Sequence, residues 1–373
     1  MKPRDRVRAT FNREPVDRTP LDMGGTAGNL QDEVYFKLLD YLGIQGKAIP
    51  YRSGTTSNYY DERVLDALGI DFRRIWLNPP AKKSRPAAGA GDGISVNEWG
   101  IPIERKGAYA GIASHPMRDF TVHDLDYWEW PDPADPARYA GVAERARALD
   151  ADGEYAISLR PPMSGGALEY GSWLRGFEQF LVDCLIAREF AWKLCEKIVQ
   201  VQMGFYEATL KLAGPYLDMV EMASDYGTQR GLLISAEVYR AVFKPFDMQI
   251  ISLIHRLAPR AKVLFHSCGA IRELIPDLLE AGVDVLNPLQ PLAAGMDSAE
   301  LKREFGHRVI FHGAIDEQEA LVGSVRDVES EVRLRVGTLG AGGGYILAPA
   351  NHICPDVPPE NVVAMYRTAA NIG

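Results

Sequence analysis

The amino-acid sequence predicts an α/β fold, a (β/α)8 TIM barrel in which residues 1–373 form a single domain. Short apolar segments alternate along the chain with longer segments in which apolar residues recur every three or four positions. The short segments are apolar almost throughout, which is typical of parallel strands that helices cover on both faces. An open, doubly wound sheet is the alternative, and the lack of a GxGxxG motif after the first apolar segment disfavours it.

Eight segments are predicted to be the barrel strands, because each is short and rich in Val, Ile, Leu, Phe or Tyr. Seven of them stand out clearly, and the eighth strand is assigned to DFRRIWL at 71–77. The predicted strands are residues 20–23, 71–77, 155–160, 217–223, 262–267, 283–288, 308–313 and 344–349. Eight is also the number of strands that closes a barrel of this class.

Helices are predicted between these strands. Ser235 is a suitable N-cap for one helix, Ser324 precedes another, and Gly282 ends a third. The predicted helices are residues 178–212, 234–257, 271–282 and 325–340.

The two parts of the chain differ in regularity. Residues 1–150 are expected to start the barrel and to decorate it with long loops, because segments 79–95 and 112–137 are rich in residues that favour irregular structure. Residues 151–373 are expected to form the regular part of the barrel.

The composition excludes several classes of function. The net charge of −9, from 41 basic and 50 acidic residues, argues against nucleic acid as a partner. No stretch approaches 18 consecutive apolar residues, so we expect no membrane span. The first 15 residues are strongly charged and lack the apolar core of a signal peptide, so we expect a cytoplasmic protein.

Polar residues follow nearly all of the predicted strands at the point where each strand ends. The carboxyl ends of barrel strands meet at one face, and that face carries the active sites of barrel enzymes. We therefore expect these side chains to converge on one site. The residues of interest are Arg160, Asp225, Tyr226, His266, Cys268, Gln290, His312, Asp316, Asn351 and Cys354.

A zinc site is predicted from three of these residues. His266 and Cys268 follow one strand, and Cys354 follows the last strand. One imidazole and two thiolates form a common zinc ligand set, and three protein ligands leave one position open for chemistry. The alternative for each cysteine is a small buried core residue, which is how we interpret Cys184 and Cys195.

The segments around these residues resemble the uroporphyrinogen decarboxylase superfamily over nearly the whole chain. Within that superfamily the sequence is most similar to the zinc-dependent methyltransferases that act with a corrinoid. The resemblance rests on FHSCGAIRELIPDLLEAGVDVLNPLQ (265–290), HGAID (312–316), GGGYILAPANHICPDVPPENVVAMYR (342–367) and DMVEMASDYGTQRGLLISAEVYRAVFKPF (218–246).

The chain departs from the decarboxylase in one respect that bears on function. The decarboxylase carries an RQAGR motif whose arginines bind the substrate carboxylates, whereas residues 22–33 here contain no arginine. A tetrapyrrole with eight carboxylates needs several cations, and Arg52, Arg160 and Arg230 are the other candidates. This difference favours methyl transfer over decarboxylation.

A second departure concerns the metal. The related methyltransferases often take a carboxylate as fourth ligand from the strand after H-x-C, and here that strand ends in residues 287–290, NPLQ. The fourth ligand is then Gln290, Glu169, water or the substrate.

The resemblance implies a zinc-dependent methyltransferase of the O-demethylase type. It would move a methyl group between a small methylated substrate, a methyl ether or amine, and a corrinoid (cobalamin) carried by a partner protein. The expected catalytic residues are Asp225, Asp316 and His312, and the expected substrate-binding residues are Arg160, Tyr226, Gln290 and Asn351.

Two other functions stay open at this point. One is a uroporphyrinogen decarboxylase-type lyase of tetrapyrrole biosynthesis, which needs neither metal nor corrinoid partner. The other is a non-catalytic barrel whose zinc is closed by four protein ligands. The sequence also leaves open whether the chain forms a homodimer.

Overall fold

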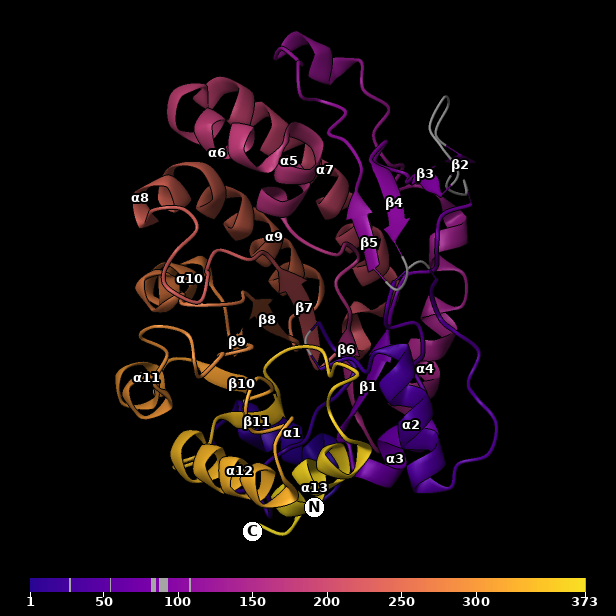
Figure 1. The fold of residues 1–373 in the computed structure, drawn as a ribbon, viewed down its shortest axis with the longest axis vertical. Helices are drawn as coiled ribbons and strands as arrows, with labels where there is room; N and C mark the ends of the chain where they lie inside the picture. The colour runs from indigo at the N-terminus through magenta and orange to yellow at the C-terminus, as the bar shows by residue number, and fades with distance from the viewer. Residues whose placement is uncertain (27, 54, 82–84, 87–92, 107–108, 373) are drawn as a thin grey trace.

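One parallel sheet organises the fold, as the computed structural model shows (Figure 1). The structure describes residues 1–26, 28–53, 55–81, 85–86, 93–106 and 109–372. Seven strands form this sheet, and their order in space, β1-β6-β7-β8-β9-β10-β11, is their order in the sequence. They are Phe72–Ile75 (β1), Ala156–Leu159 (β6), Met219–Ala223 (β7), Lys262–His266 (β8), Val285–Asn287 (β9), Ile310–Ile315 (β10) and Tyr345–Pro349 (β11).

These strands confirm seven of the eight that the sequence predicts, including the one assigned to 71–77. Each strand pairs in parallel with the next one along the chain, and nearly every residue in them is buried. The result is a curled α/β sheet of the kind that builds barrels.

The predicted strand at 20–23 is not an extended strand but a single bridge between Leu21 and Leu347 of β11. On this side the Leu347 N–H donates to the Pro20 carbonyl at 2.9 Å. On the other side the Leu21 carbonyl accepts a hydrogen bond of 2.9 Å from the N–H of Asp71, just before β1. The segment therefore contacts both edges of the sheet without forming a ladder with either.

Local chemistry explains why this strand is cut short. Pro20 has no N–H to donate. The N–H of Leu21 donates instead to the Asp71 carboxylate at 2.7 Å. Gly24 then takes a φ of 90°, which is open to glycine and turns the chain away from the sheet.

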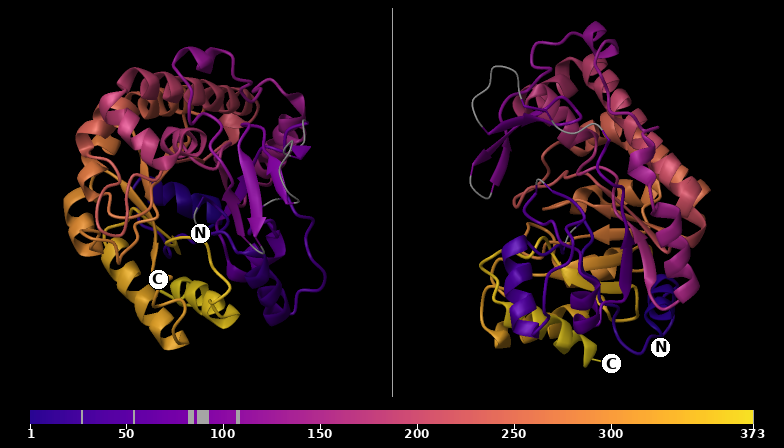
Figure 2. Two further views of the ribbon diagram at one scale, coloured as in Figure 1. Left: turned by 45° about the horizontal axis from the view of Figure 1, so that its top comes forward. Right: turned by 90° about the vertical axis from the view of Figure 1, so that its right-hand side faces the viewer.

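Helices surround the sheet, and the left view of Figure 2 shows them as an arc around the strands. The α-helices are Pro3–Phe11 (α1), Asp32–Leu42 (α2), Glu62–Leu68 (α3), Val142–Asp152 (α4), Ala167–Arg175 (α5), Phe177–Ile186 (α6), Arg188–Ala213 (α7), Ala236–Val238 (α8), Lys244–Leu257 (α9), Ile275–Ala281 (α10), Ser298–Phe305 (α11), Val325–Leu339 (α12) and Pro359–Ala370 (α13). Short helical turns are His123–Asp126 (η1), Pro136–Tyr139 (η2), Gly214–Tyr216 (η3), Tyr239–Phe243 (η4) and Arg272–Leu274 (η5).

The predicted helices are found, with one interruption. Ala187 has φ −119° and ψ 50°, outside the helical region, so the segment 178–212 is divided into α6 and α7. Ser235 caps α8 by accepting the N–H of Val238, and Ser324 forms a capping box at the start of α12.

A small antiparallel sheet, separate from the main one, is formed by the part of the chain that follows β1 and precedes α4. Its strands are Arg85–Pro86 (β2), Ile94–Val96 (β3), Pro102–Lys106 (β4) and Tyr109–Ile112 (β5). This sheet is not predicted from the sequence, because its strands are only two to five residues long. Much of the segment 79–95, predicted to be irregular, lies outside the described residues.

Helix α1 closes the amino-terminal end of the sheet through buried ion pairs. Arg4 Nε lies 3.0 Å and Arg8 Nε 2.8 Å from the carboxylate of Asp218, the residue before β7. Arg6 Nη1 lies 2.6 Å from the carboxylate of Asp71, the residue before β1. We call these contacts the basal ion pairs. They anchor the first helix under the sheet, opposite the ends where the predicted site residues lie.

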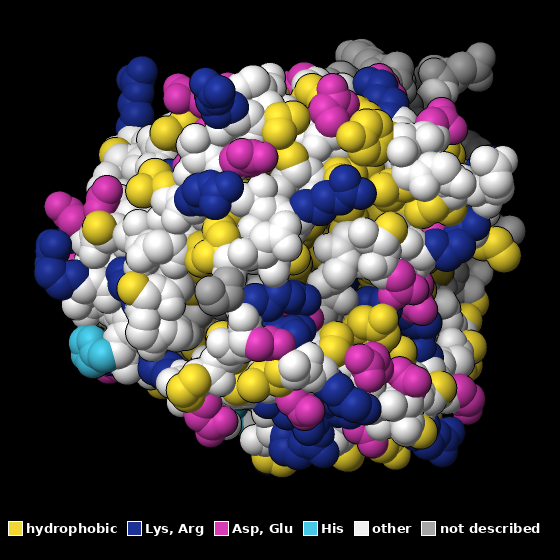
Figure 3. Space-filling view, turned by 90° about the horizontal axis from the view of Figure 1, so that it is seen from below, with side chains coloured by type: hydrophobic (Ala, Val, Ile, Leu, Met, Phe, Trp, Pro, Cys, Tyr) yellow, Lys and Arg dark blue, Asp and Glu magenta, His cyan; other side chains and the backbone are white. Residues whose placement is uncertain are grey.

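The outer surface carries charges of both signs. Figure 3 shows Lys and Arg side chains interspersed with Asp and Glu on the face seen from below Figure 1. Among the described residues, no helix has the length and apolarity needed to cross a bilayer.

Candidate functional site

Three ligand-type side chains meet at the carboxyl ends of β7 and β8. Asp225 follows β7, and His266 and Cys268 lie at and just after the end of β8. His266 Nε2 is 3.4 Å from Cys268 Sγ and 3.5 Å from Asp225 Oδ1. The three ligand atoms all lie within 4.8 Å of one another. We call these residues the donor group.

The donor group has the chemistry that zinc requires. One imidazole nitrogen, one sulfur and one carboxylate oxygen are all common zinc ligands. Burial raises the pKa of the Cys268 thiol, and the neighbouring Asp225 carboxylate raises it further. A divalent cation between them would favour the thiolate and balance the carboxylate charge. The residues present therefore fit a zinc ion.

Cys354 lies outside this group of three. It follows β11, is half-buried, and its Sγ accepts a hydrogen bond of 3.2 Å from the side chain of Gln31. Asp225, expected to be catalytic, takes the third position among the described ligand atoms instead.

A chain of buried hydrogen bonds orients His266. Its Nδ1 lies 2.5 Å from Asn287 Oδ1, and Asn287 Nδ2 lies 2.7 Å from His312 Nδ1. His312 Nε2 in turn lies 2.8 Å from Asp22 Oδ2. We call His266, Asn287, His312 and Asp22 the buried relay.

The relay determines which nitrogen of His266 is free. Because an amide oxygen only accepts hydrogen bonds, His266 Nδ1 carries the hydrogen and Nε2 presents its lone pair to the donor group. Both ring nitrogens of His312 are occupied within the relay. His312, expected to be catalytic, therefore supports the donor group indirectly, through its contact with Asn287.

A buried arginine on the edge strand β1 anchors the far end of the relay. Arg74 donates two hydrogen bonds to Asp22, at 2.7 and 2.6 Å, and one to Glu221 at 3.1 Å. Burial alone would raise the pKa of Asp22, but the Arg74 charge beside it lowers that pKa to about 2. Asp22 is therefore an anion that accepts the hydrogen of His312 Nε2.

Glu169 holds Asp225 in place. Its carboxylate accepts hydrogen bonds from the backbone N–H of Asp225, from Ser224 Oγ at 3.0 Å and from the N–H of Gly166 at 2.7 Å. Burial raises the pKa of Glu169. This candidate for the fourth ligand thus contacts the backbone of a donor-group residue.

Gln290 and Tyr226 also support the donor group from outside it. Gln290 Oε1 accepts the N–H of Gly269 at 2.9 Å, which fixes the loop that carries Cys268. The Tyr226 hydroxyl donates to buried Asp247 at 3.0 Å, and its ring packs in the core against Phe265.

Asp316 and Asn351 form local contacts. Asp316 closes the turn after β10, because its oxygens accept the backbone N–H groups of residues 318–320 at 2.9 to 3.1 Å. Asn351 Oδ1 accepts the N–H of His352 at 2.8 Å.

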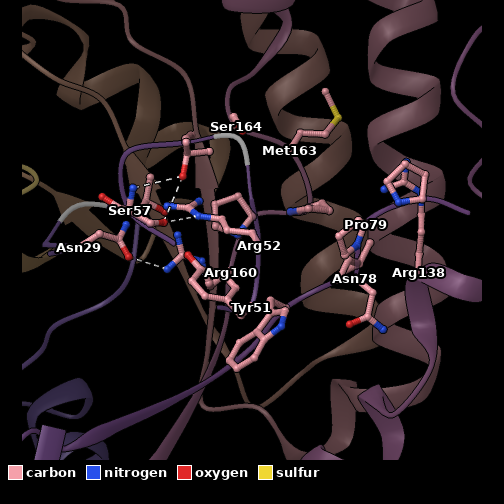
Figure 4. A pocket seen from close by; sticks show the side chains of 18 of the residues that line it. Asn29, Tyr51, Arg52, Ser57, Asn78, Pro79, Arg138, Arg160, Met163 and Ser164 are labelled. Carbon is pink, nitrogen blue, oxygen red and sulfur yellow. Dashed lines mark hydrogen bonds between the residues drawn. The ribbon is translucent and has the colours of Figure 1, made fainter. Parts of the chain in front are cut away.

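A cavity of about 470 Å³ opens at the carboxyl end of the sheet, and Figure 4 shows side chains that line it. Arg160, which follows β6, and His352, which follows β11, both line it. Ala223 at the end of β7 also lines it and is paired in register with His266. Asp225, His266 and Cys268 do not themselves line the cavity, which approaches the donor group through Ala223 and His352.

His352 lies between the cavity and the donor group. Burial lowers its pKa to about 4, and the charges of His266, Arg160 and Arg52 contribute. Its ring is therefore neutral near pH 7, and its buried Nδ1 has no partner among the described residues.

A buried cluster of charged residues behind the relay is not predicted from the sequence. Asp22, Arg74 and Glu221 are nearly inaccessible to solvent, yet none is predicted as a site residue. The signal that could have found them is a charged residue within an otherwise apolar strand, in the segments 71–77 and 217–223.

Comparison with known proteins gives one family match. A family model described as uroporphyrinogen decarboxylase (URO-D) matches residues 119–372. The chain is 23% identical to a uroporphyrinogen decarboxylase of Alkalilimnicola ehrlichii, covering 97% of this chain and 92% of that protein. It is 24% identical to a uroporphyrinogen decarboxylase of Mannheimia succiniciproducens, covering 96% of this chain and 94% of that protein.

A solved structure, of a methyltransferase from Methanosarcina mazei, shares the fold. It superposes with a TM-score of 0.64 at 16% identity, covering 99% of this chain and 98% of that one.

Proposed function

The chain belongs to the uroporphyrinogen decarboxylase family, and on that premise we propose that it is a zinc-dependent methyltransferase. In this proposal it moves a methyl group between a small methylated substrate and a corrinoid carried by a partner protein. The donor group carries the proposal, because decarboxylation of a porphyrinogen has no need of an imidazole, a thiol and a carboxylate within 4.8 Å of one another.

The zinc would be held by Asp225, His266 and Cys268. When bound, zinc supplies Lewis acidity, which makes the heteroatom of a methyl ether or amine a better leaving group. The buried relay keeps His266 Nε2 free for this purpose. Glu169 holds the backbone of Asp225, and Gln290 holds the loop of Cys268.

The rest of the site handles the substrate. Arg160 and His352 line the cavity and can orient a polar substrate within it. The neutral His352 ring can accept a hydrogen bond from the substrate through Nδ1.

Metal content and methyl transfer test the proposal together. Cys268→Ala should lose bound zinc and the transfer of a methyl group to free cob(I)alamin, while its circular dichroism stays that of the wild type. Cys184→Ala is the matched control, because Cys184 is buried in α6 and belongs to no ligand group among the described residues. Full zinc occupancy in Cys268→Ala contradicts the proposal.

A decarboxylase is the second candidate, and Arg52 and Arg160 in the cavity favour it by offering cations to substrate carboxylates. Incubation of the metal-free protein with uroporphyrinogen separates the two. Formation of coproporphyrinogen at rates independent of zinc supports the decarboxylase and excludes our first proposal.

A further inference from the structure

One end of the cavity collects polar atoms that have no partner in the part of the chain that the structure describes. They are Tyr51 Oη, Ser57 Oγ and, nearer the donor group, His352 Nδ1. Ser57 is only 3% exposed. Buried polar atoms in native proteins are nearly always hydrogen-bonded, so three atoms without a partner on residues that line one cavity indicate a polar ligand.

Two arginines lie at the same end, as Figure 4 shows. Arg52 Nε donates to the Ser57 carbonyl at 2.6 Å, and Arg160 Nη1 donates to Asn29 Oδ1 at 2.8 Å. These acceptors are neutral, and neither arginine forms an ion pair with a described carboxylate. This contrasts with Arg74, whose charge is balanced by Asp22 and Glu221.

The two guanidinium groups are held close together. Both stack on the ring of Tyr51, at 5.0 Å for Arg52 and 5.3 Å for Arg160. Burial lowers the pKa of Arg52 to about 10, and the positive charge of Arg160 lowers it as well. An anion bound between two like charges in such a pocket offsets their repulsion and is therefore favoured there.

We propose that this end of the cavity binds the carboxylate of the substrate, which makes the substrate a small carboxylic acid. Arg52 and Arg160 bind its oxygens, and the hydroxyls of Tyr51 and Ser57 donate to them. The rest of the molecule lies along Trp76 and reaches toward His352 and the donor group. Two arginines match one carboxylate or two, and not the eight of a uroporphyrinogen. That this acid is a methylated substrate rests on the proposed function, whereas its binding does not.

The test compares benzoate with benzamide, which share a ring that can pack on Trp76 and differ in charge. In calorimetric titrations of the zinc-loaded wild type, benzoate should bind at least about 10-fold more tightly than benzamide. Equal affinity for the two probes overturns the proposal. This comparison needs no variant, so it stays decisive if a substitution prevents folding.

Variants locate the site. Arg52→Gln and Arg160→Gln should each weaken benzoate binding by about 10- to 100-fold, because each removes a charged hydrogen bond. Arg240→Gln is the matched control, because Arg240 pairs with Asp277 on the outer helices and lies outside the cavity. Unchanged benzoate affinity in both cavity variants overturns the proposal.

A last arm separates this inference from the proposed function. Benzoate could also bind through a metal in the donor group, so the titration is repeated with Cys268→Ala. Retained benzoate binding supports the arginine site whether or not the protein transfers methyl groups. Loss of benzoate binding in Cys268→Ala assigns the carboxylate to the metal and overturns the inference.

Discussion

The two ends of the parallel sheet differ in whether their buried arginines form ion pairs. At the amino-terminal end, Arg4 and Arg8 share the Asp218 carboxylate, and Arg6 pairs with Asp71. At the carboxyl end, Arg52 and Arg160 line a cavity without a carboxylate partner among the described residues. Paired buried charges hold a fold together, whereas unpaired ones are available to a ligand.

Buried carboxylates show the same contrast. Asp247 and Glu317, both toward the carboxyl end, have no Lys or Arg partner among the described residues. Burial raises the pKa of Asp247 to about 7 and that of Glu317 to about 8. Glu317 Oε2 is also buried without a hydrogen-bond partner in the described chain. At the carboxyl end, these charged and titratable groups thus lack an ion-pair partner among the described residues. At the amino-terminal end, the basal ion pairs supply such partners.

The largest expected effect comes from breaking the basal ion pairs. Asp218→Ala leaves Arg4 and Arg8 without their buried carboxylate, so we expect a loss of about 3–5 kcal/mol in the free energy of unfolding. Zinc content should not change. Urea unfolding measures the first and metal analysis the second.

Asp150→Ala provides the control for that experiment. Asp150 also pairs with Arg4 but is 34% exposed, so its loss should lower the free energy of unfolding by about 1 kcal/mol or less. If the two variants lose equal stability, burial is not what gives the basal ion pairs their strength.

Breaking the relay should affect the opposite end. Asn287→Ala leaves His266 Nδ1 without its acceptor, so we expect zinc affinity to fall by about 10- to 100-fold, or 1.4 to 2.7 kcal/mol. Competition with a zinc chelator measures the affinity, and the spectrum of the cobalt-substituted protein reports the ligand geometry.

The matched control for the relay is Asn361→Ala. Asn361 is equally buried, but its side chain donates to the carbonyls of Leu321 and Gly323, away from the donor group. This variant should lose stability and keep wild-type zinc affinity. Equal losses of zinc affinity in both variants would mean that the relay acts only through general stability.

The smallest expected effect is a pH dependence. Because burial raises the pKa of Asp247 in the folded state above that in the unfolded state, the folded protein holds a proton that the unfolded chain has lost. The free energy of unfolding should therefore fall as pH rises, by about 1 kcal/mol between pH 5 and 6 from this group. Asp247→Asn should lack this component. Parallel profiles for wild type and variant in urea unfolding would exclude it.

Much of the fold follows from the sequence, because continuous apolar runs identify buried parallel strands. Seven strands are predicted within a few residues. The prediction of a strand at 20–23 is wrong, because apolar composition does not reveal that Leu21 donates its N–H to a side chain. The small sheet β2–β5 is not predicted, because strands of two to five residues are too short for an apolar pattern to be detected.

The site is predictable only in outline. Polar residues after strands predict which edge carries the chemistry, and His266, Cys268, Asp225 and Arg160 all lie there. The relay is not predictable from spacing, because it joins His312 to Asp22 across 290 residues and depends on how the segment 20–23 lies against β10. The position of Cys354 likewise depends on the course of the loop after β11 rather than on a strand.

The bridge between Leu21 and β11 sets an order of events during biosynthesis. Tyr366 also donates to the carbonyl of Asp22, 344 residues earlier in the chain. A ribosome adding about 5–20 residues per second needs roughly 20–70 s to deliver that partner. The relay needs only residues 22 to 312, whereas the cavity also needs His352, so the nascent chain completes its cavity only near the end of translation.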